Sequence, residues 1–115
     1  MNFVNLTPHS LTLRGEGGDQ VIQPSGEIAR VAQSPGEEID TVNGIPAYSA
    51  PVTGAVEGLG EPQNDTIYIV SGMVLAHCQN RTDVYGPGTG PQDGAIRNER
   101  GHIVAVTRLI AAPQS

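Results

Sequence analysis

The chain has 115 residues, a formal net charge of -6, no tryptophan and one phenylalanine. A chain of this length is expected to form a single domain spanning residues 1–115. Its six cations are all arginines and form no basic run, which argues against duplex nucleic acid as a partner, because a DNA-binding protein needs a basic face.

The first half of the chain predicts short strands separated by turns. Residues 2–6 form an apolar-rich run that Pro8 interrupts, and residues 10–14 and 20–23 flank a glycine-rich turn, as in a hairpin. Residues 27–33 alternate between polar and apolar types, which favours another strand. The dipeptide Asn43-Gly44 predicts a hairpin that joins residues 39–42 to residues 45–52. Residues 54–63 are expected to form an ordered loop.

The second half contains the longest apolar run. Residues 66–70, with the sequence TIYIV, are apolar on both faces and predict a central strand with Tyr68 in the core. Ser71 is expected to cap a short helix from residue 72 to about residue 79, which would carry an apolar face formed by Met73, Val74, Ala76 and His77. A brief strand at 84–85 and a closing hairpin from 95–98 and 102–110 complete a mainly β (α+β) fold. The expected architecture is a small barrel-like or sandwich module with one short helix.

Cysteine content and hydropathy set expectations for location and assembly. Cys78 is the single cysteine, so no intrachain disulfide can form and a cytoplasmic location is expected. Residues 1–13 lack the pattern of an export signal, and no 18-residue apolar run would span a membrane. The scarcity of large side chains predicts a homo-oligomer. The three histidines and Cys78 lack metal-ligand spacing, so neither a metal site nor a cofactor is predicted.

A glycine-rich segment at residues 86–94 is the main candidate for ligand binding. Glycines allow close approach of a ligand, and successive backbone N–H groups can bind an anion. Arg81 and Arg97 flank the segment and would meet one phosphate or carboxylate if it folded back. The alternative is a rigid surface turn. Asp83 and Asp93 would orient those arginines, accept ribose hydroxyls or cap turns, of which turn capping is the commoner role. The segment matches neither a Walker A loop nor a dinucleotide fingerprint.

A second candidate is the polar segment at residues 5–10. Asn5, Thr7 and His9 would reach the same ligand, or Asn5 and Thr7 would instead close a turn at the end of a strand. His9 is the best general base by residue type, yet no nucleophile is paired with it, so no catalytic residue is predicted. Tyr85 is the aromatic side chain best placed to stack on a base. The predicted ligand-binding residues are Asn5, Thr7, His9, Arg81, Asp83, Tyr85, Gly86, Gly88, Thr89, Gly90 and Arg97.

Four segments, NLTPHSLTL, PSGEIARV, EGLGEPQNDTIYIVSGMV and RTDVYGPGTGPQDGAIRNERGHIVAV, resemble a largely uncharacterised family of small phage and prophage proteins. The resemblance covers nearly the whole chain, and the NLTPH opening and DTIYIVS strand are its most specific parts. In size, arginine and glycine content and expected oligomer, the chain also resembles phage anti-defence sponges that counter Thoeris and CBASS immunity. That resemblance implies a protein that sequesters a nucleotide second messenger without cleaving it.

The leading expectation is therefore a cytoplasmic, non-enzymatic, homo-oligomeric protein that binds a small nucleotide signal, such as a cyclic ADP-ribose isomer or a cyclic oligonucleotide. One alternative is a hydrolase of phosphodiester or glycosidic bonds that uses His9 or Asp83 as the base. Another is a phage structural or assembly module that binds no small ligand.

Overall fold

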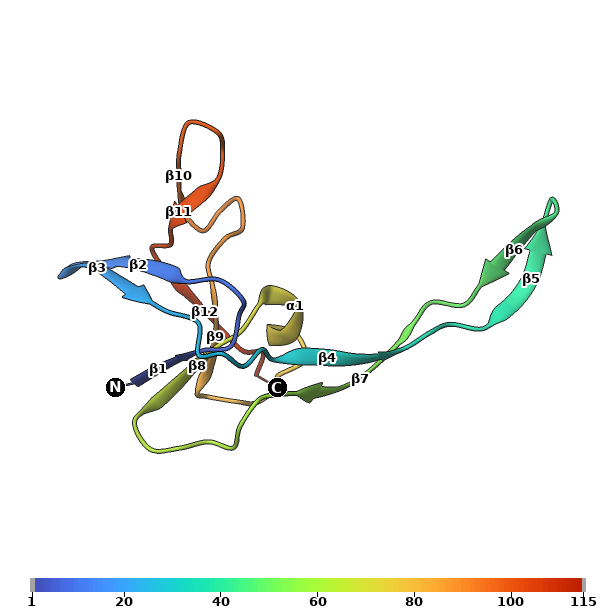
Figure 1. Cartoon of the computed structure of the whole chain (residues 1–115), viewed down its shortest axis with the longest axis horizontal. Helices are drawn as coiled ribbons and strands as arrows, with labels where there is room; N and C mark the ends of the chain where they lie inside the picture. Colours follow the sequence, from blue (N-terminus) through green and yellow to red (C-terminus); the bar gives the residue numbers. More distant parts are fainter. Residues whose placement is uncertain (1, 115) are drawn as a thin grey trace.

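The protein consists of a body built on one four-stranded sheet and a long β-arm that projects from it (Figure 1). The computed structural model describes residues 2–114, and of residues 52 and 53 only the backbone. The elements in chain order are β1 (Asn2–Asn5), β2 (Leu11–Gly15), β3 (Gly18–Ile22), β4 (Arg30–Ser34), β5 (Glu38–Val42), β6 (Ile45–Tyr48), β7 (Val52–Glu57), β8 (Thr66–Ile69), α1 (Gly72–Leu75), β9 (Val84–Pro87), β10 (Ile96–Arg97), β11 (Ile103–Ala105) and β12 (Leu109–Ala111).

The four-stranded sheet has the order β1-β8-β9-β12. Strand β8 pairs in parallel with β1 on one side and with β9 on the other, and β12 closes the sheet antiparallel to β9. Ile69, Val70 and Val84 are completely buried there. The TIYIV run is thus a central strand, as predicted, and Tyr68 is in the core, where its hydroxyl donates to the Glu61 carbonyl over 3.1 Å.

Helix α1 is shorter than predicted. The Ser71 hydroxyl accepts a hydrogen bond from the Val74 amide, so the cap is where the sequence places it. The chain then tightens, because the His77 and Cys78 amides donate to carbonyls only three residues earlier, which ends the α-helix at Leu75. The predicted apolar face is largely wrong, because the buried residues are Val74, Leu75 and Cys78, while Met73, Ala76 and His77 are exposed.

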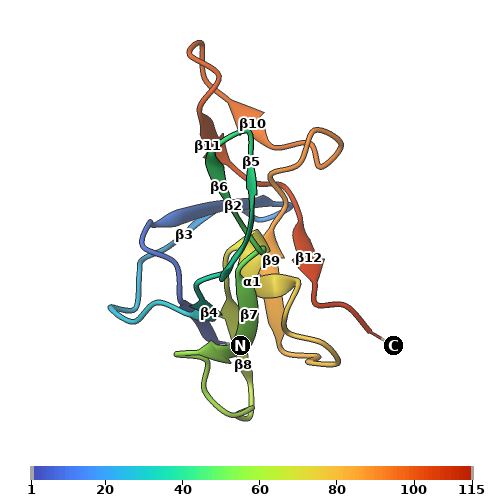
Figure 2. The same ribbon diagram turned by 90° about the vertical axis from the view of Figure 1, so that its right-hand side faces the viewer.

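The remaining strands pair two by two, and no barrel closes within residues 2–114. The hairpins β2–β3 and β10–β11 confirm two of the three predicted from the sequence. Residues 109–111 do not extend the second of these hairpins but cross to the central sheet as β12. Figure 2 shows the β10–β11 hairpin standing clear of the body.

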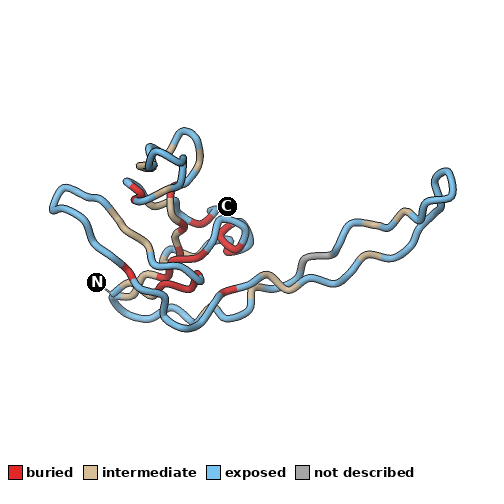
Figure 3. The backbone as a smooth tube through the Cα atoms, turned by 45° about the horizontal axis from the view of Figure 1, so that its top comes forward, coloured by how far each residue is buried: buried red, intermediate tan, exposed pale blue. Residues whose placement is uncertain are grey.

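The arm is a two-part β-ribbon formed by residues 30–57. At its base β4 pairs with β7, and at its tip β5 pairs with β6 through the predicted turn, where both Asn43 and Gly44 have positive φ angles. The expectation of an ordered loop from residue 54 is wrong as far as Glu57, because Val31 and Val56 face each other in the β4–β7 pairing. Apart from its base, the ribbon is mostly exposed (Figure 3).

The arm makes the molecule unusually extended for its length. The Cα radius of gyration is 17.4 Å, whereas a compact chain of this length would have about 13 Å. No helix among residues 2–114 is long and apolar enough to cross a membrane.

The central sheet sets the stability of the body. Val84→Ala removes two methyl groups at a completely buried position in β9, so we expect a loss of about 2 kcal/mol or more in unfolding free energy. The matched control is Val21→Ala on the exposed β3 strand, where the change should stay within about 0.5 kcal/mol. Urea denaturation measures both, and equal losses would contradict the assignment of the core.

Candidate anion-binding site

The polar segment at residues 5–9 is a structural junction. Asn5 is 1% exposed, and its amide group donates to the carbonyls of His9 at 2.8 Å and Ile22 at 3.1 Å. Its Oδ1 accepts from the Thr7 amide at 3.0 Å and lies 2.7 Å from the Thr7 hydroxyl. Both side chains are buried and are used to hold the protein's own backbone, which is the turn-closing alternative considered from the sequence.

His9 lies in a different environment from Asn5 and Thr7. It is exposed, and with Thr89 it lines a groove of about 420 Å³ that also contains Leu11, Ile103 and Val104. Two of the predicted ligand-binding residues, His9 and Thr89, therefore share one surface. The groove is lined by apolar side chains from β2 and β11 and carries few charges of its own.

Arg81 and Asp83 form a bidentate ion pair. Arg81 Nε and Nη2 lie 2.9 and 3.0 Å from the two Asp83 carboxylate oxygens, and Nη2 also donates to the Gly60 carbonyl at 3.0 Å. The hydrogen bonds from Arg81 lower the pKa of the Asp83 carboxyl below its usual value. This pair ties the loop before β8 to the start of β9.

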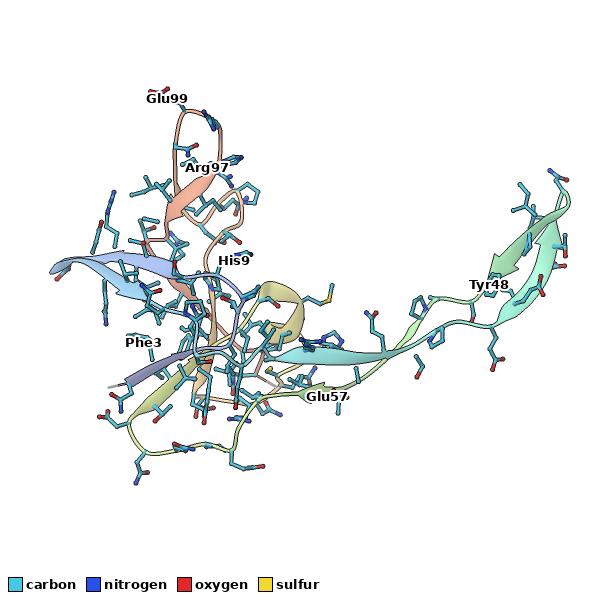
Figure 4. All side chains as sticks on the ribbon, in the orientation of Figure 1. Phe3, His9, Tyr48, Glu57, Arg97 and Glu99 are labelled. Atoms are coloured by element: carbon cyan, nitrogen blue, oxygen red, sulfur yellow. The ribbon has the colours of Figure 1, made fainter. Side chains whose placement is uncertain are left out.

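Arg97 lies far along the chain from this pair and on a different part of the molecule. It belongs to β10 on the protruding hairpin, where its Nη1 donates to the Gly101 carbonyl at 2.9 Å (Figure 4). Arg81 contacts the loop at Gly60 on the opposite side of the central sheet from this hairpin (Figure 1). The two arginines predicted to meet one anion are thus not brought together.

The glycines of the 86–94 segment pack against the protein itself. A side chain at Gly86 would meet Leu75 and the Val70 carbonyl, while the Gly88 amide donates to the Arg108 carbonyl at 3.0 Å. The Gly90 amide donates to Asp93 Oδ2 at 2.8 Å, which is the turn-capping role considered for this aspartate. Tyr85 is half-buried in β9, in register with Ile69 and Ala111.

Two other arginines do line one pocket. A cavity of about 480 Å³ lies between the β2–β3 hairpin and residues 106–109, and Arg14 and Arg108 are both in its lining. Its floor includes Leu13 and Val106, and the glycine-rich turn at residues 15–18 forms one rim. The volume falls within the range of small-molecule sites. Sequence reasoning missed this pair because the two arginines are 94 positions apart; the signal present was the glycine turn directly after Arg14.

Each pocket arginine has a carboxylate neighbour, but the two are held differently. Arg14 Nε and Nη2 bond the Asp19 carboxylate at 2.7 and 3.0 Å, which holds the pKa of Asp19 below its ordinary value. Arg108 Nη1 is 3.9 Å from Asp93 Oδ1, and its side chain is 56% exposed. Because a guanidinium has five N–H donors and Arg108 is the more loosely paired, Arg108 is better able to bind an incoming anion.

Comparison of the chain with protein-family models, with curated proteins and with solved structures finds no match. The geometry of the pocket and of the arm therefore carries the functional argument.

The Asn5 junction can be tested by removing the side chain. Asn5→Ala leaves two carbonyls and the Thr7 amide without their buried partner, so we expect a loss of about 3 kcal/mol in unfolding free energy. Asn98→Ala is the control, because the Asn98 side chain also accepts hydrogen bonds from two backbone amides, those of Arg100 and His102, but is exposed. Its cost should be below about 1 kcal/mol. An Asn5→Ala variant as stable as the wild type would refute the junction.

The Arg81–Asp83 pair predicts an acid-dependent contribution to stability. The folded-state pKa of Asp83 is lowered, so the contribution is fully present above the unfolded pKa of about 3.9 and is lost as pH falls through the folded value. Asp83→Asn should remove this part of the acid dependence in urea titrations between pH 2 and 6. Arg81→Gln should remove the same part, and the double variant should remove no more than either single one. Additive losses would show that the two side chains do not act as a pair.

Proposed function

We propose that this protein binds a phosphate-bearing small molecule in the pocket between the β2–β3 hairpin and residues 106–109, and holds it without chemical change. The observation that carries the proposal is the presence of Arg14 and Arg108, from distant parts of the chain, in the lining of one cavity. A planar guanidinium offers parallel N–H donors that match two oxygens of a phosphate.

Several features of the pocket suit this class of ligand. Its size suits a mononucleotide or dinucleotide, and the glycines at its rim permit close approach to the backbone. Leu13, Val106 and Leu109 add apolar lining for the less polar part of such a ligand. Asp19 compensates part of the charge of Arg14, so Arg108 should provide the larger share of the attraction.

The proposed biological setting follows from the sequence motifs and not from the pocket. A protein encoded by a phage, as this resemblance implies, is made inside the infected cell, so the proposed location is the host cytoplasm. In that setting a protein that binds a nucleotide immune signal and does not cleave it would lower the free concentration of the signal. We propose this sequestration as the function.

The binding proposal is tested by calorimetry with a panel of cyclic ADP-ribose isomers and cyclic dinucleotides. At least one should bind, and Arg108→Gln should weaken binding by about tenfold or more, since a charged hydrogen bond contributes about 1.5–3 kcal/mol. Arg14→Gln should weaken it less. Arg30→Gln, on the exposed side of β4 and outside the pocket, is the matched control and should bind like the wild type.

The same experiment distinguishes sequestration from hydrolysis. After incubation the protein is denatured and the released nucleotide is analysed by mass spectrometry, where recovery of intact ligand supports sequestration. Cleaved ligand would point to a hydrolase instead. The proposal is overturned if no member of the panel binds, or if Arg108→Gln and Arg30→Gln bind equally well.

The arm favours a second candidate, a phage structural or assembly module. A ribbon that extends away from the body with apolar side chains at its tip is a common means of joining protein subunits. A protein with this function alone would bind no nucleotide, so the panel also separates the two candidates.

A further inference from the structure

The tip of the arm exposes large apolar side chains that its own chain leaves in solvent. Ile39, Val42, Ile45 and Tyr48 are 57–67% exposed, and all four lie on the β5–β6 ribbon (Figure 4). Val42 and Ile45 are paired across the turn and therefore share one side of the ribbon. An isolated two-stranded ribbon is marginally stable in water, so the tip gains stability if another surface covers it.

The whole chain exposes more surface than a compact monomer would. Its accessible surface is 7790 Å², whereas a globular monomer of this mass would expose roughly 6,000 Å². The excess of roughly 1,800 Å² is on the scale of a standard protein–protein interface. The projecting arm contributes to this excess, so association through the arm would remove part of it.

Charge and chemistry indicate which surface covers the tip. Glu37, Glu38 and Asp40 give residues 37–49 a formal charge of -3 with no cation. Residues 95–107, which lead into and out of the β10–β11 turn, carry two arginines and one glutamate, a formal charge of +1. Arg97 of this basic segment is in register with Ile103, which lines the apolar groove beside His9 and Thr89. The tip is thus apolar and acidic, whereas the groove is apolar with a basic margin.

We infer that the tip of the arm docks in this groove of a second copy of the chain. The apolar side chains of β5 and β6 cover Leu11, Ile103 and Val104 of the second copy, and the three tip carboxylates lie near Arg97 and Arg100. Reciprocal docking of two arms gives a two-fold dimer, in which the same two surfaces meet twice. The groove adjoins the proposed nucleotide pocket at Val106, but Arg14 and Arg108 do not line it, and the inference does not rest on the ligand.

Sedimentation velocity on the full chain tests the docking. The wild type should have the mass of two or more protomers at micromolar concentration, and rising salt should weaken the association because the contact pairs opposite charges. In the key variant, Asn-Gly replaces residues 38–48. Glu37 and Ser49 already bond across the ribbon, by an amide-to-carbonyl contact of 2.8 Å and an amide-to-hydroxyl contact of 2.9 Å, so the shortened ribbon keeps its closure. This variant should be monomeric, and its thermal unfolding should stay cooperative, with circular dichroism reduced only by the loss of β5 and β6.

Charge reversal tests the partner surface. The double variant Arg97→Glu/Arg100→Glu should raise the dissociation constant at least tenfold, and adding Glu37→Arg/Glu38→Arg should restore most of the loss. Met73→Gln is the control, since Met73 is an exposed apolar residue on α1 outside the groove, and its association should match the wild type. A monomeric wild type overturns the inference, and so does an oligomer whose mass survives shortening of the arm. If shortening the arm abolishes association but Arg97→Glu/Arg100→Glu leaves the dissociation constant unchanged, the tip does not dock in this groove.

Discussion

The architecture depends on one buried amide, the side chain of Asn5. It lies at the end of β1, where the chain leaves the central sheet, and bonds to the end of β3 and to the turn at residues 7–9. The backbone of the next residue links two more elements. The Leu6 amide donates to the Ile69 carbonyl of β8, and the Leu6 carbonyl accepts from the Ala29 amide, just before the arm. Sheet, hairpin and arm thus meet within two residues. Since every polar atom of the amide is used, an apolar replacement of the same size could not do the same work.

A small core constrains everything built around it. Except for Tyr68, which is also buried, the buried apolar residues are aliphatic or Cys78. The core is one small cluster around β8, β9 and α1, against which Val4 of β1 and Val31 and Val56 of the arm base also pack. Burial of the thiol raises the pKa of Cys78, which leaves it an unreactive packing group. Hydrogen bonds at strand ends and the ion pair of Arg81 with Asp83 complement this modest core. Among the described residues of the outlying hairpins, Ile22 and Ala105 are buried, while most of the other apolar residues stay in contact with water.

Local signals account for the parts of the fold that the sequence predicts. The TIYIV run, the Asn43-Gly44 turn and the Ser71 cap each depend on a few adjacent residues, and all three are present in the structure. The predicted helix end failed because tight turns after Leu75 depend on packing against β9 and β4. The sequence also could not predict that the arm projects from the body. The alternation of polar and apolar residues from β4 to β7 predicts that the strands pair, but not whether the paired strands pack against the body. Arg14 and Arg108 line one pocket because residues 106–109 run beside β2, where Val106 pairs with Leu13. No pattern of neighbouring residues in the sequence predicts this long-range pairing.

The same reasoning explains why the flanking arginines of the glycine segment were poor candidates for a ligand. Arg81 has a carboxylate two residues away, and Arg97 has a backbone carbonyl within its own hairpin, so each finds a partner at little entropic cost. The glycine amides at positions 88 and 90 are likewise used by neighbours. A group already satisfied locally must lose a bond before it gains one from a ligand. Arg108, at 3.9 Å from Asp93, would give up less on binding an anion, which is why the proposed site is built on it and not on the arginines that flank the glycine segment.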